Sequence, residues 1–170
     1  GVHLMIEAFL QLSPEEQRRS RLDIYGTADP RYLGSMMETI RHSELPEEIK
    51  SNITFHGRYT PDDIANIFDT IDISILPSLC ADTAPQTIFE SFSNGLPIIA
   101  PRIGGFPDFV TDGKNGYLFD CGSHISLSKK MKKILAQPEK LEYFKRNIPK
   151  NKRMSDHVKE INLIYRDLLN

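Results

Sequence analysis

The sequence predicts an α/β protein in which a doubly wound parallel sheet carries helices on both of its faces. Three observations support this prediction. Short apolar runs of strand length alternate along the 170 residues with segments whose apolar residues recur at helical spacing. The chain contains no internal repeat and no low-complexity linker. Alternation of this kind is typical of a parallel sheet, and right-handed crossovers then place helices on both faces.

The individual elements follow from the spacing of apolar residues and from local signals. The expected strands are residues 22–25, 52–56, 72–76, 97–100 and 117–119. Helical spacing predicts helices over residues 2–12, 31–42, 61–68, 85–95, 123–136, 138–148 and 155–169. Ser13-Pro14-Glu15-Glu16 and Thr60-Pro61-Asp62-Asp63 each combine a capping side chain with a proline and two acids, which is typical of a helix start.

The stretch from Leu76 to Gly105 organises the rest of the chain. A loop carrying Asp82 follows the strand and leads to a helix that begins near Pro85, where a missing N–H is tolerated. Glu90 lies inside this helix, eight residues after the aspartate. The next apolar strand then ends in Gly104-Gly105.

This arrangement suits a phosphorylated ligand. A helix N-terminus at the carboxyl edge of a parallel sheet presents unpaired N–H groups and a partial positive charge, and ligands bind at this edge. Gly104 and Gly105 let a second backbone approach where a Cβ would clash. A diphosphate bound here would leave Asp82 and Glu90 to contact hydroxyl groups at either end. We therefore expect a nucleotide-sugar.

The same stretch resembles the donor-binding segment of the group 1 glycosyltransferases (family 4, retaining, GT-B fold). The family pattern of E-x7-E, G-x-P-V-I-A and GG stands here as Asp82-x7-Glu90, Gly95-Leu96-Pro97-Ile98-Ile99-Ala100 and Gly104-Gly105. Asp82 departs from the glutamate that the family usually has. Further segments similar to the family cover nearly all of the chain, namely residues 1–9, 22–26, 53–59, 72–78 and 112–118.

The resemblance implies a Rossmann-like fold, the C-terminal half of a GT-B enzyme, and gives roles to the matching residues. Glu90 would bind the ribose hydroxyls, and Asp82 would contact hydroxyls of the transferred sugar, so these two are the catalytic candidates. The other expected donor contacts are Gly57, Arg58 and Tyr59 beside the base, Ser78, the backbone of Pro85, Gln86 and Thr87 at the diphosphate, and Gly104 and Gly105 in a loop near the donor.

The resemblance also implies what the parent enzyme does. It would move a sugar from a nucleotide-diphosphate-sugar to a saccharide or lipid-linked acceptor in polysaccharide biosynthesis, without a metal or another cofactor. The Arg and Lys that clamp the diphosphate in this family, and the acceptor-binding N-terminal domain, would lie upstream of Gly1. Residues 1–170 would then form a single nucleotide-sugar-binding domain, which we expect to be inactive alone.

Composition argues against several other classes of protein. A net charge of −2 argues against a nucleic-acid partner, and no apolar run approaches the roughly 20 residues that a membrane span needs. Cys80 and Cys121 lie far apart and indicate reduced thiols rather than a metal site. We expect a cytoplasmic protein. The lysine-rich run at residues 129–133 is a solvated helix face or, alternatively, a peripheral contact of the full-length protein with the inner face of the cell membrane.

Several alternatives stay open from the sequence. Asp82 could cap the following helix, and Glu90 could face solvent. Arg58 could be a solvated loop residue, and His56 could be structural. The whole protein could also be a GT-B-type nucleotide-sugar epimerase or a non-catalytic nucleotide-sugar-binding subunit.

Overall fold

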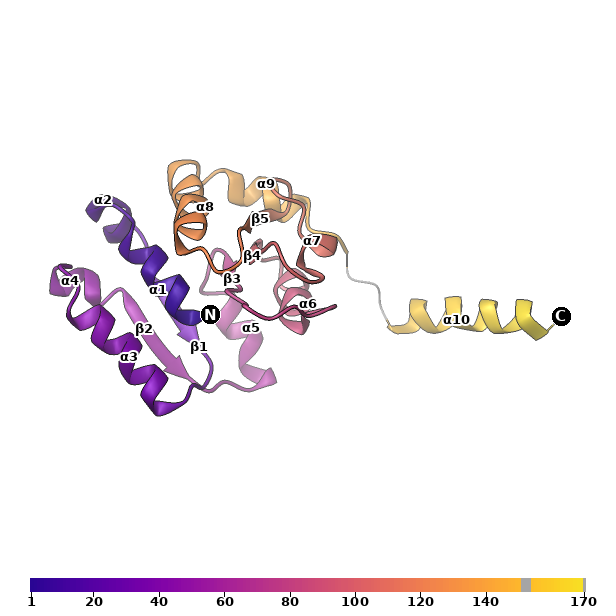
Figure 1. Cartoon of the computed structure of the whole chain (residues 1–170). Helices are drawn as coiled ribbons and strands as arrows, with labels where there is room; N and C mark the ends of the chain where they lie inside the picture. Colours follow the sequence, from indigo (N-terminus) through magenta and orange to yellow (C-terminus); the bar gives the residue numbers. More distant parts are fainter. Residues whose placement is uncertain (151–153, 170) are drawn as a thin grey trace.

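The fold is built on five short parallel strands that form two groups (Figure 1). A computed structural model describes residues 1–150 and 154–169. One group pairs β1 (Leu22–Tyr25) with β2 (Ile53–Gly57), and the other has the order β3-β4-β5, with bounds Ser74–Ile75, Ile98–Pro101 and Gly116–Phe119. Every pairing is parallel, which confirms the α/β prediction.

Helices connect the strands in the expected order. They are α1 (Val2–Leu10), α2 (Pro14–Arg18), α3 (Pro30–Arg41), α4 (Glu47–Lys50), α5 (Ile64–Phe68), α6 (Gln86–Ser93), α7 (Phe106–Phe109), α8 (His124–Ala136), α9 (Lys140–Arg146) and α10 (Met154–Leu169). A short 3-10 turn, Pro61–Asp63, precedes α5. Ser13 and Glu16 form the capping box that starts α2, so the local signal in the sequence identified a true helix start.

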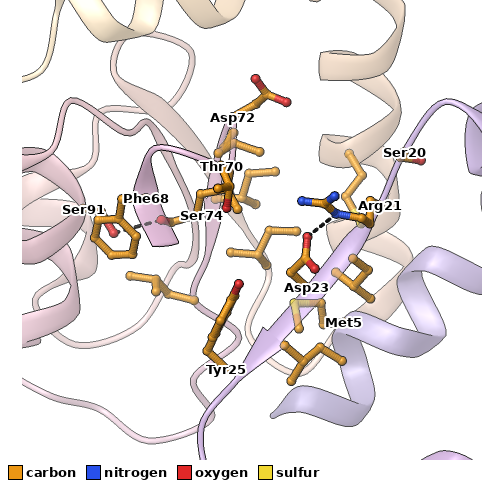
Figure 2. Close-up of a pocket in the computed structure, with 18 of the residues that line it drawn as sticks. Met5, Ser20, Arg21, Asp23, Tyr25, Phe68, Thr70, Asp72, Ser74 and Ser91 are labelled. Carbon is orange, nitrogen blue, oxygen red and sulfur yellow. Dashed lines mark hydrogen bonds and ion pairs between the residues drawn. The ribbon is translucent and has the colours of Figure 1, made fainter. Parts of the chain in front are cut away.

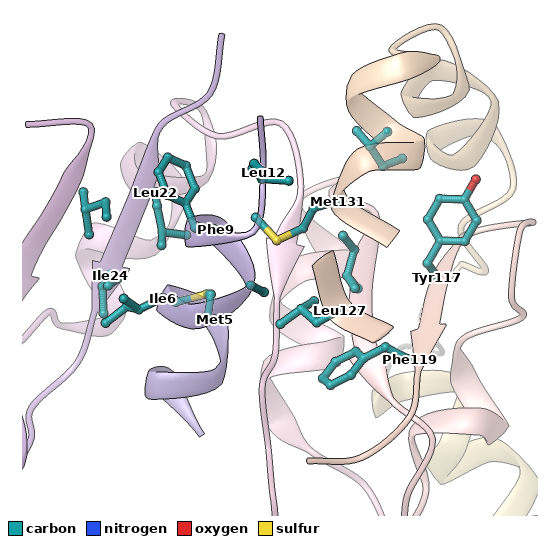
Figure 3. Close-up of a cluster of buried hydrophobic side chains, with 14 of the residues drawn as sticks. Met5, Ile6, Phe9, Leu12, Leu22, Ile24, Tyr117, Phe119, Leu127 and Met131 are labelled. Atoms are coloured by element: carbon teal, nitrogen blue, oxygen red, sulfur yellow. The ribbon is translucent and has the colours of Figure 1, made fainter. Parts of the chain in front are cut away.

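Both faces of the strands β4 and β5 are buried, each in a separate core. All four residues of each strand are buried. Ile99, Tyr117 and Phe119 pack into a core shared with α1, α3 and α8, part of which is shown in Figure 3. Ile98 and Leu118 alternate with them and pack into a second core with α6 and α7. Period-two alternation therefore sorts these side chains between two helical layers, as in a doubly wound sheet.

The structure differs from the sequence-based expectation in several places. Strand β3 covers two residues, Ser74–Ile75, where residues 72–76 were expected, because among the described residues it pairs with β4 alone. The single turns α4 and α7 were not expected, since four residues are too few to show a helical period. Pro85 occupies the cap position directly before α6 rather than its first turn.

Helix α10 extends away from the other elements in Figure 1. The sequence predicts an apolar side for this helix, and the structure leaves most of that side in solvent. Val158, Ile164, Tyr165 and Leu168 are all exposed, whereas Ile161 is half-buried. Helix α10 therefore adds little to the two cores.

A carboxylate on β1 joins the two strands of the smaller group. The Asp23 side chain is only 9% exposed, and Arg21 Nε donates a 2.6 Å hydrogen bond to it. His56 on β2 places Nε2 2.7 Å from the other carboxylate oxygen. Burial acts to raise the pKa of Asp23, but the hydrogen bonds from His56 and Arg21 outweigh burial and hold this pKa below its ordinary value.

Replacing this carboxylate should make stability depend less on pH. Because the folded-state pKa is lowered, the ionised Asp23 stabilises the fold above its ordinary pKa near 4, and this contribution is lost as the pH falls through the folded-state value. Asp23→Asn should therefore reduce the free energy of unfolding at pH 6, and the difference from the wild type should shrink below about pH 4. Urea denaturation at pH 6, 4 and 3 measures this difference.

The matched control is Asp62→Asn, at an exposed position in the turn before α5. It should change the free energy of unfolding little at any of the three pH values. A deficit in Asp23→Asn that stays constant from pH 6 to pH 3 would contradict the assigned role of the carboxylate.

Candidate functional site

The glycine pair Gly104-Gly105 packs directly on the backbone of the loop that carries Asp82. A Cβ on Gly105 would lie 1.9 Å from the carbonyl oxygen of Thr83, and one on Gly104 would lie 2.5 Å from that of Asp82. Gly104 also has a positive φ of 53°. The N–H of Gly105 donates to the carbonyl oxygen of Asp82 at 2.7 Å. Only glycine fits this contact, and the contact fixes the loop after β3 against the loop after β4.

Asp82 is exposed, and its carboxylate is held by its own loop. Oδ1 accepts a 3.1 Å hydrogen bond from the N–H of Ala84. No side chain caps α6, so the alternative in which Asp82 caps this helix is not what the structure shows. The N–H groups in the first turn, at Gln86 and Thr87, have no carbonyl partner within the helix and can face an anion.

Glu90 is half-buried one turn into α6. Gln86 Nε2 donates to Glu90 Oε1 at 3.1 Å, from one helical turn earlier. Together with Thr87, Glu90 lines one side of a cavity of about 750 Å³ that lies between β1 and β3. The cavity side of α6 therefore carries a carboxylate whose orientation is set by a neighbouring amide.

Three aromatic rings gather at the carboxyl ends of β1 and β2. Tyr25 stacks on His56 with ring centroids 4.4 Å apart and planes 7° apart, and its edge meets Tyr59 at 6.2 Å. The chain turns at Gly57, whose φ is 75°. The exposed Arg58 lines a second, smaller cavity of about 310 Å³ beside these rings. A planar base could lie against such a surface.

The same small cavity carries one further carboxylate. Asp63 accepts hydrogen bonds from the N–H of Thr60 at 2.8 Å and from its hydroxyl at 2.7 Å. These two hydrogen bonds, the backbone one first, hold the pKa of Asp63 below its ordinary value. Asp63 is thus engaged in starting the turn before α5, as its sequence context predicts.

The structure groups the expected site residues at one edge but in separate places. Tyr59, Thr87 and Glu90 line the larger cavity. Asp82 lies in the loop under the glycine pair, and Ser78 uses its hydroxyl to donate to the carbonyl oxygen of Cys80 at 3.0 Å. Figure 2 shows the larger cavity, with Asp23 and Tyr25 of β1 on one side and Thr70, Asp72 and Ser74 on the other.

Sequence reasoning missed Tyr25 and underrated His56. Both side chains lie near the ends of neighbouring strands, and β1 and β2 are irregular between Ile24 and Tyr25, where the pairing shifts by one residue. The available signal was an aromatic residue at the last position of each predicted strand. That signal becomes informative only once the two strands are known to be neighbours.

The described residues contain neither a metal-ligand cluster nor a membrane-spanning helix. No group of three or more His, Cys, Asp or Glu side chains in residues 1–150 and 154–169 is placed to hold a metal ion. Within the same ranges, no helix combines the length and the apolar character that crossing a membrane requires.

Comparison with solved structures supports the fold. Over 87% of this chain and 39% of the other, the structure matches HepE of Anabaena in complex with UDP, with a TM-score of 0.75 and 21% identity. A C-terminal domain of a group 1 family glycosyl transferase from Francisella tularensis matches with a TM-score of 0.73 and 19% identity, over 86% of this chain and 74% of that domain. The chain therefore has the fold found in GT-B glycosyltransferases.

Comparison with curated proteins finds sugar transferases. A lipopolysaccharide 1,2-N-acetylglucosaminetransferase of Salmonella typhimurium is 27% identical over 145 residues, which is 82% of this chain and 37% of the relative. A sulfoquinovosyl transferase of Arabidopsis thaliana is 31% identical over 91 residues, 52% of this chain and 18% of the relative. The chain thus spans less than two fifths of either relative. The sequence profile described as "Glycosyl transferases group 1" matches residues 1–151, and the chain belongs to this family.

Proposed function

We propose that this chain is the C-terminal, donor-binding domain of a retaining, family 4 glycosyltransferase. One observation carries the proposal: the open first turn of α6, the half-buried Glu90 and the glycine-held loop of Asp82 all lie at the carboxyl edge of the strands. This is the edge at which doubly wound sheets bind nucleotides. Membership of the group 1 glycosyltransferase family also supports a role in binding a sugar donor.

The donor would be a nucleotide-diphosphate-sugar. HepE of Anabaena, which shares the fold, has been solved with UDP and with UDP-glucose. In this chain the diphosphate would lie at the N–H groups of Gln86 and Thr87. The ribose hydroxyls would donate to Glu90, and the base would lie beside Gly57, Arg58 and Tyr59.

Transfer would depend on stabilising the leaving group. As the bond from the anomeric carbon to the diphosphate breaks, negative charge develops on the diphosphate and positive charge on the sugar. The N-terminus of α6 would stabilise the first charge, together with the Arg and Lys that the family supplies outside this chain. Asp82 and the backbone of Gly104 and Gly105 would hold the sugar. No bound metal is part of this proposal.

The whole protein would carry an acceptor-binding N-terminal domain as well. We propose a saccharide or lipid-linked acceptor and transfer of a hexosyl group, because the Salmonella relative is named for a transfer to lipopolysaccharide. Residues 1–170 alone would then bind a donor weakly and catalyse no transfer. We place the full-length protein in the cytoplasm, with the option of a peripheral contact at the inner face of the membrane.

A second candidate function is a non-catalytic nucleotide-sugar-binding subunit. It is favoured by Asp82, which is one carbon shorter than the usual glutamate and is held by the N–H of Ala84 within its own loop. Both candidates bind the nucleotide through Glu90, so they differ only at the sugar.

Replacing Glu90 should weaken nucleotide binding and abolish recognition of the ribose. In Glu90→Gln, the ribose hydroxyls lose a charged acceptor. We therefore expect the dissociation constant for UDP or GDP to rise by about tenfold to hundredfold. Protein-observed NMR titration of the 170-residue chain measures this weak binding. The wild type should also bind the 2′-deoxynucleoside diphosphate more weakly than the ribonucleotide, whereas Glu90→Gln should bind both equally.

The matched control is Glu142→Gln in α9, because Glu142 is exposed, is paired with Lys145 and lines neither of the two cavities. This variant should bind nucleotide like the wild type. If Glu90→Gln keeps wild-type affinity and still prefers the ribonucleotide, Glu90 is not the ribose ligand.

Substitutions at Asp82 separate the two candidate functions in the full-length protein. If the protein is a transferase, Asp82→Asn should lower kcat by at least about tenfold, because the sugar loses a charged partner, while nucleotide affinity stays unchanged. Asp82→Glu should retain or raise the rate. Measured transfer from the nucleotide-sugar decides between them. A full-length protein that binds nucleotide but transfers no sugar, with either residue at position 82, would favour the non-catalytic subunit.

A further inference from the structure

The two cysteines of the chain lie on loops that meet at the carboxyl edge of the sheet. Cys80 is in the loop between β3 and α6, and Cys121 is in the loop between β5 and α8. Both thiols are free, and both residues are exposed. The sequence contains two cysteines in all, so a reaction between thiols of this chain involves this pair.

The packing of the helices explains why these loops meet although β4 lies between β3 and β5. Helix α8 packs against α1. The start of α1 lies against the loop after β3, since a Cβ on Gly1 would lie 1.5 Å from the carbonyl oxygen of Pro77. The chain that leaves β5 therefore crosses the carboxyl end of β4 toward Pro77 before it begins α8 at His124.

Two contacts join the loops directly. The Sγ atom of Cys121 lies 3.9 Å from the carbonyl oxygen of Ser78. A Cβ on Gly122 would lie 4.0 Å from Cδ2 of Leu79, the residue before Cys80. The N–H of Cys80 donates to the Ser78 hydroxyl at 3.3 Å, and this hydroxyl donates to the Cys80 carbonyl oxygen at 3.0 Å. Ser78 therefore contacts both cysteines.

Both loops have room to bring the two sulfur atoms together. Residues 79–84 and 120–122 are all exposed, so no buried side chain fixes either cysteine. Gly122, next to Cys121, has a φ of 77° and nothing closer than 4.0 Å to an added Cβ. A disulfide needs its two Cα atoms about 4.4–6.8 Å apart. Loops that already touch can reach this separation through side-chain rotation and a shift of exposed backbone.

We propose that Cys80 and Cys121 are a redox modification site, which a small-molecule disulfide such as oxidised glutathione converts to an intramolecular disulfide. The thiolate of one cysteine attacks the small disulfide, forms a mixed disulfide and releases one small thiol. The thiolate of the other cysteine then attacks the protein sulfur of the mixed disulfide, forms the protein S–S bond and releases the second small thiol. Two protein thiols are oxidised, and their protons leave with the two small thiols.

The new bond changes the loop that carries Asp82, and its effect on a donor rests on the proposed function. Drawing Cys80 toward Cys121 breaks the two hydrogen bonds between Cys80 and Ser78, and Asp82 follows Cys80 by two residues. Ser78 and Asp82 are both expected donor contacts, whereas Glu90 lies farther along the chain in α6. Oxidation should therefore weaken contacts to the sugar more than contacts to the nucleotide.

The test treats the full-length protein with oxidised glutathione at pH 8, blocks the remaining thiols and maps disulfides by mass spectrometry. Trypsin places the two cysteines in separate peptides, residues 59–102 and 115–129, so only the new bond joins them. The joined peptide should form at least about tenfold faster in the folded protein than in urea, because the fold holds the loops together. It should form equally fast at low and high protein concentration, and dithiothreitol should release it.

The oxidised sample also tests the consequence at the donor site. Oxidation should lower the affinity for a nucleotide-sugar about threefold to tenfold relative to that for the nucleoside diphosphate, because contacts of the sugar are lost. The matched controls are Cys80→Ser and Cys121→Ser, which can form a mixed disulfide but no internal bond. Each should lack the joined peptide and keep the affinity ratio of the reduced protein after the same treatment.

Separate glutathione adducts on the two cysteines without the joined peptide would overturn the proposal. So would a joined peptide that forms no faster in the folded protein than in urea, or one whose formation rises with protein concentration, because the bond would then link two copies. An unchanged affinity ratio in the cross-linked protein would overturn the effect on the donor. A reduced protein that binds no nucleotide-sugar would count against the proposed function, whereas the joined peptide would still support the thiol site.

Discussion

The site depends on a place where two backbones touch. Gly104 and Gly105 approach the carbonyl groups of Asp82 and Thr83 so closely that no side chain fits between the two loops. The hydrogen bond from Gly105 to Asp82 then fixes one loop relative to the other. Since these loops follow β3 and β4, the contact determines how the carboxyl edge of the sheet is shaped around Asp82 and the start of α6.

The contact between the two loops has a defined geometry because β4 and β5, the strands next to it, are packed on both faces. Residues of β4 and β5 alternate between two apolar cores, so neither strand can shift by one residue without moving buried side chains into the wrong core. Gly116 adds a second close approach, since a Cβ there would lie 2.1 Å from the carbonyl oxygen of Ile98 on β4. A rigid pair of strands thus supports loops that are exposed and chemically open, which is how many α/β proteins combine stability with binding.

The larger cavity brings the proposed donor-binding residues beside the facing edges of β1 and β3. Glu90 and Thr87 line the same cavity as the facing edges of β1 and β3, and so do Tyr25 and Tyr59.

Local patterns in the sequence predicted much of the fold. The bounds of β1 were predicted in full, and the capping box of Ser13 and Glu16 was recognisable because both partners lie within four residues. The helix around Glu90 was likewise predicted from the spacing of its apolar residues, and the glycine pair from its place after the next strand. These features depend on the residues themselves, so no knowledge of the rest of the fold was needed.

Features that depend on non-local pairing could not be predicted. The stack of Tyr25 on His56 requires the register between β1 and β2, including the shift after Ile24. The short length of β3 depends on an edge without a partner, and the hydrogen bond that holds Asp82 depends on the exact path of its loop. The division of the strands into two groups also has no signature in a sequence that alternates regularly.

The central claim is that the close approach of Gly105 to Thr83 holds the donor site in shape, and its most direct test is the affinity of Gly105→Ala for a nucleotide-sugar. Protein-observed NMR of the 170-residue chain would use whichever of UDP-, GDP- and ADP-glucose the wild type binds best. Gly34→Ala is the control, because Gly34 lies in α3 with open space around it. The account predicts that Gly105→Ala stays folded but binds at least about tenfold more weakly, since the added methyl must displace the loop at a cost of about 1–3 kcal/mol, whereas Gly34→Ala binds like the wild type. Wild-type affinity in a folded Gly105→Ala would contradict it.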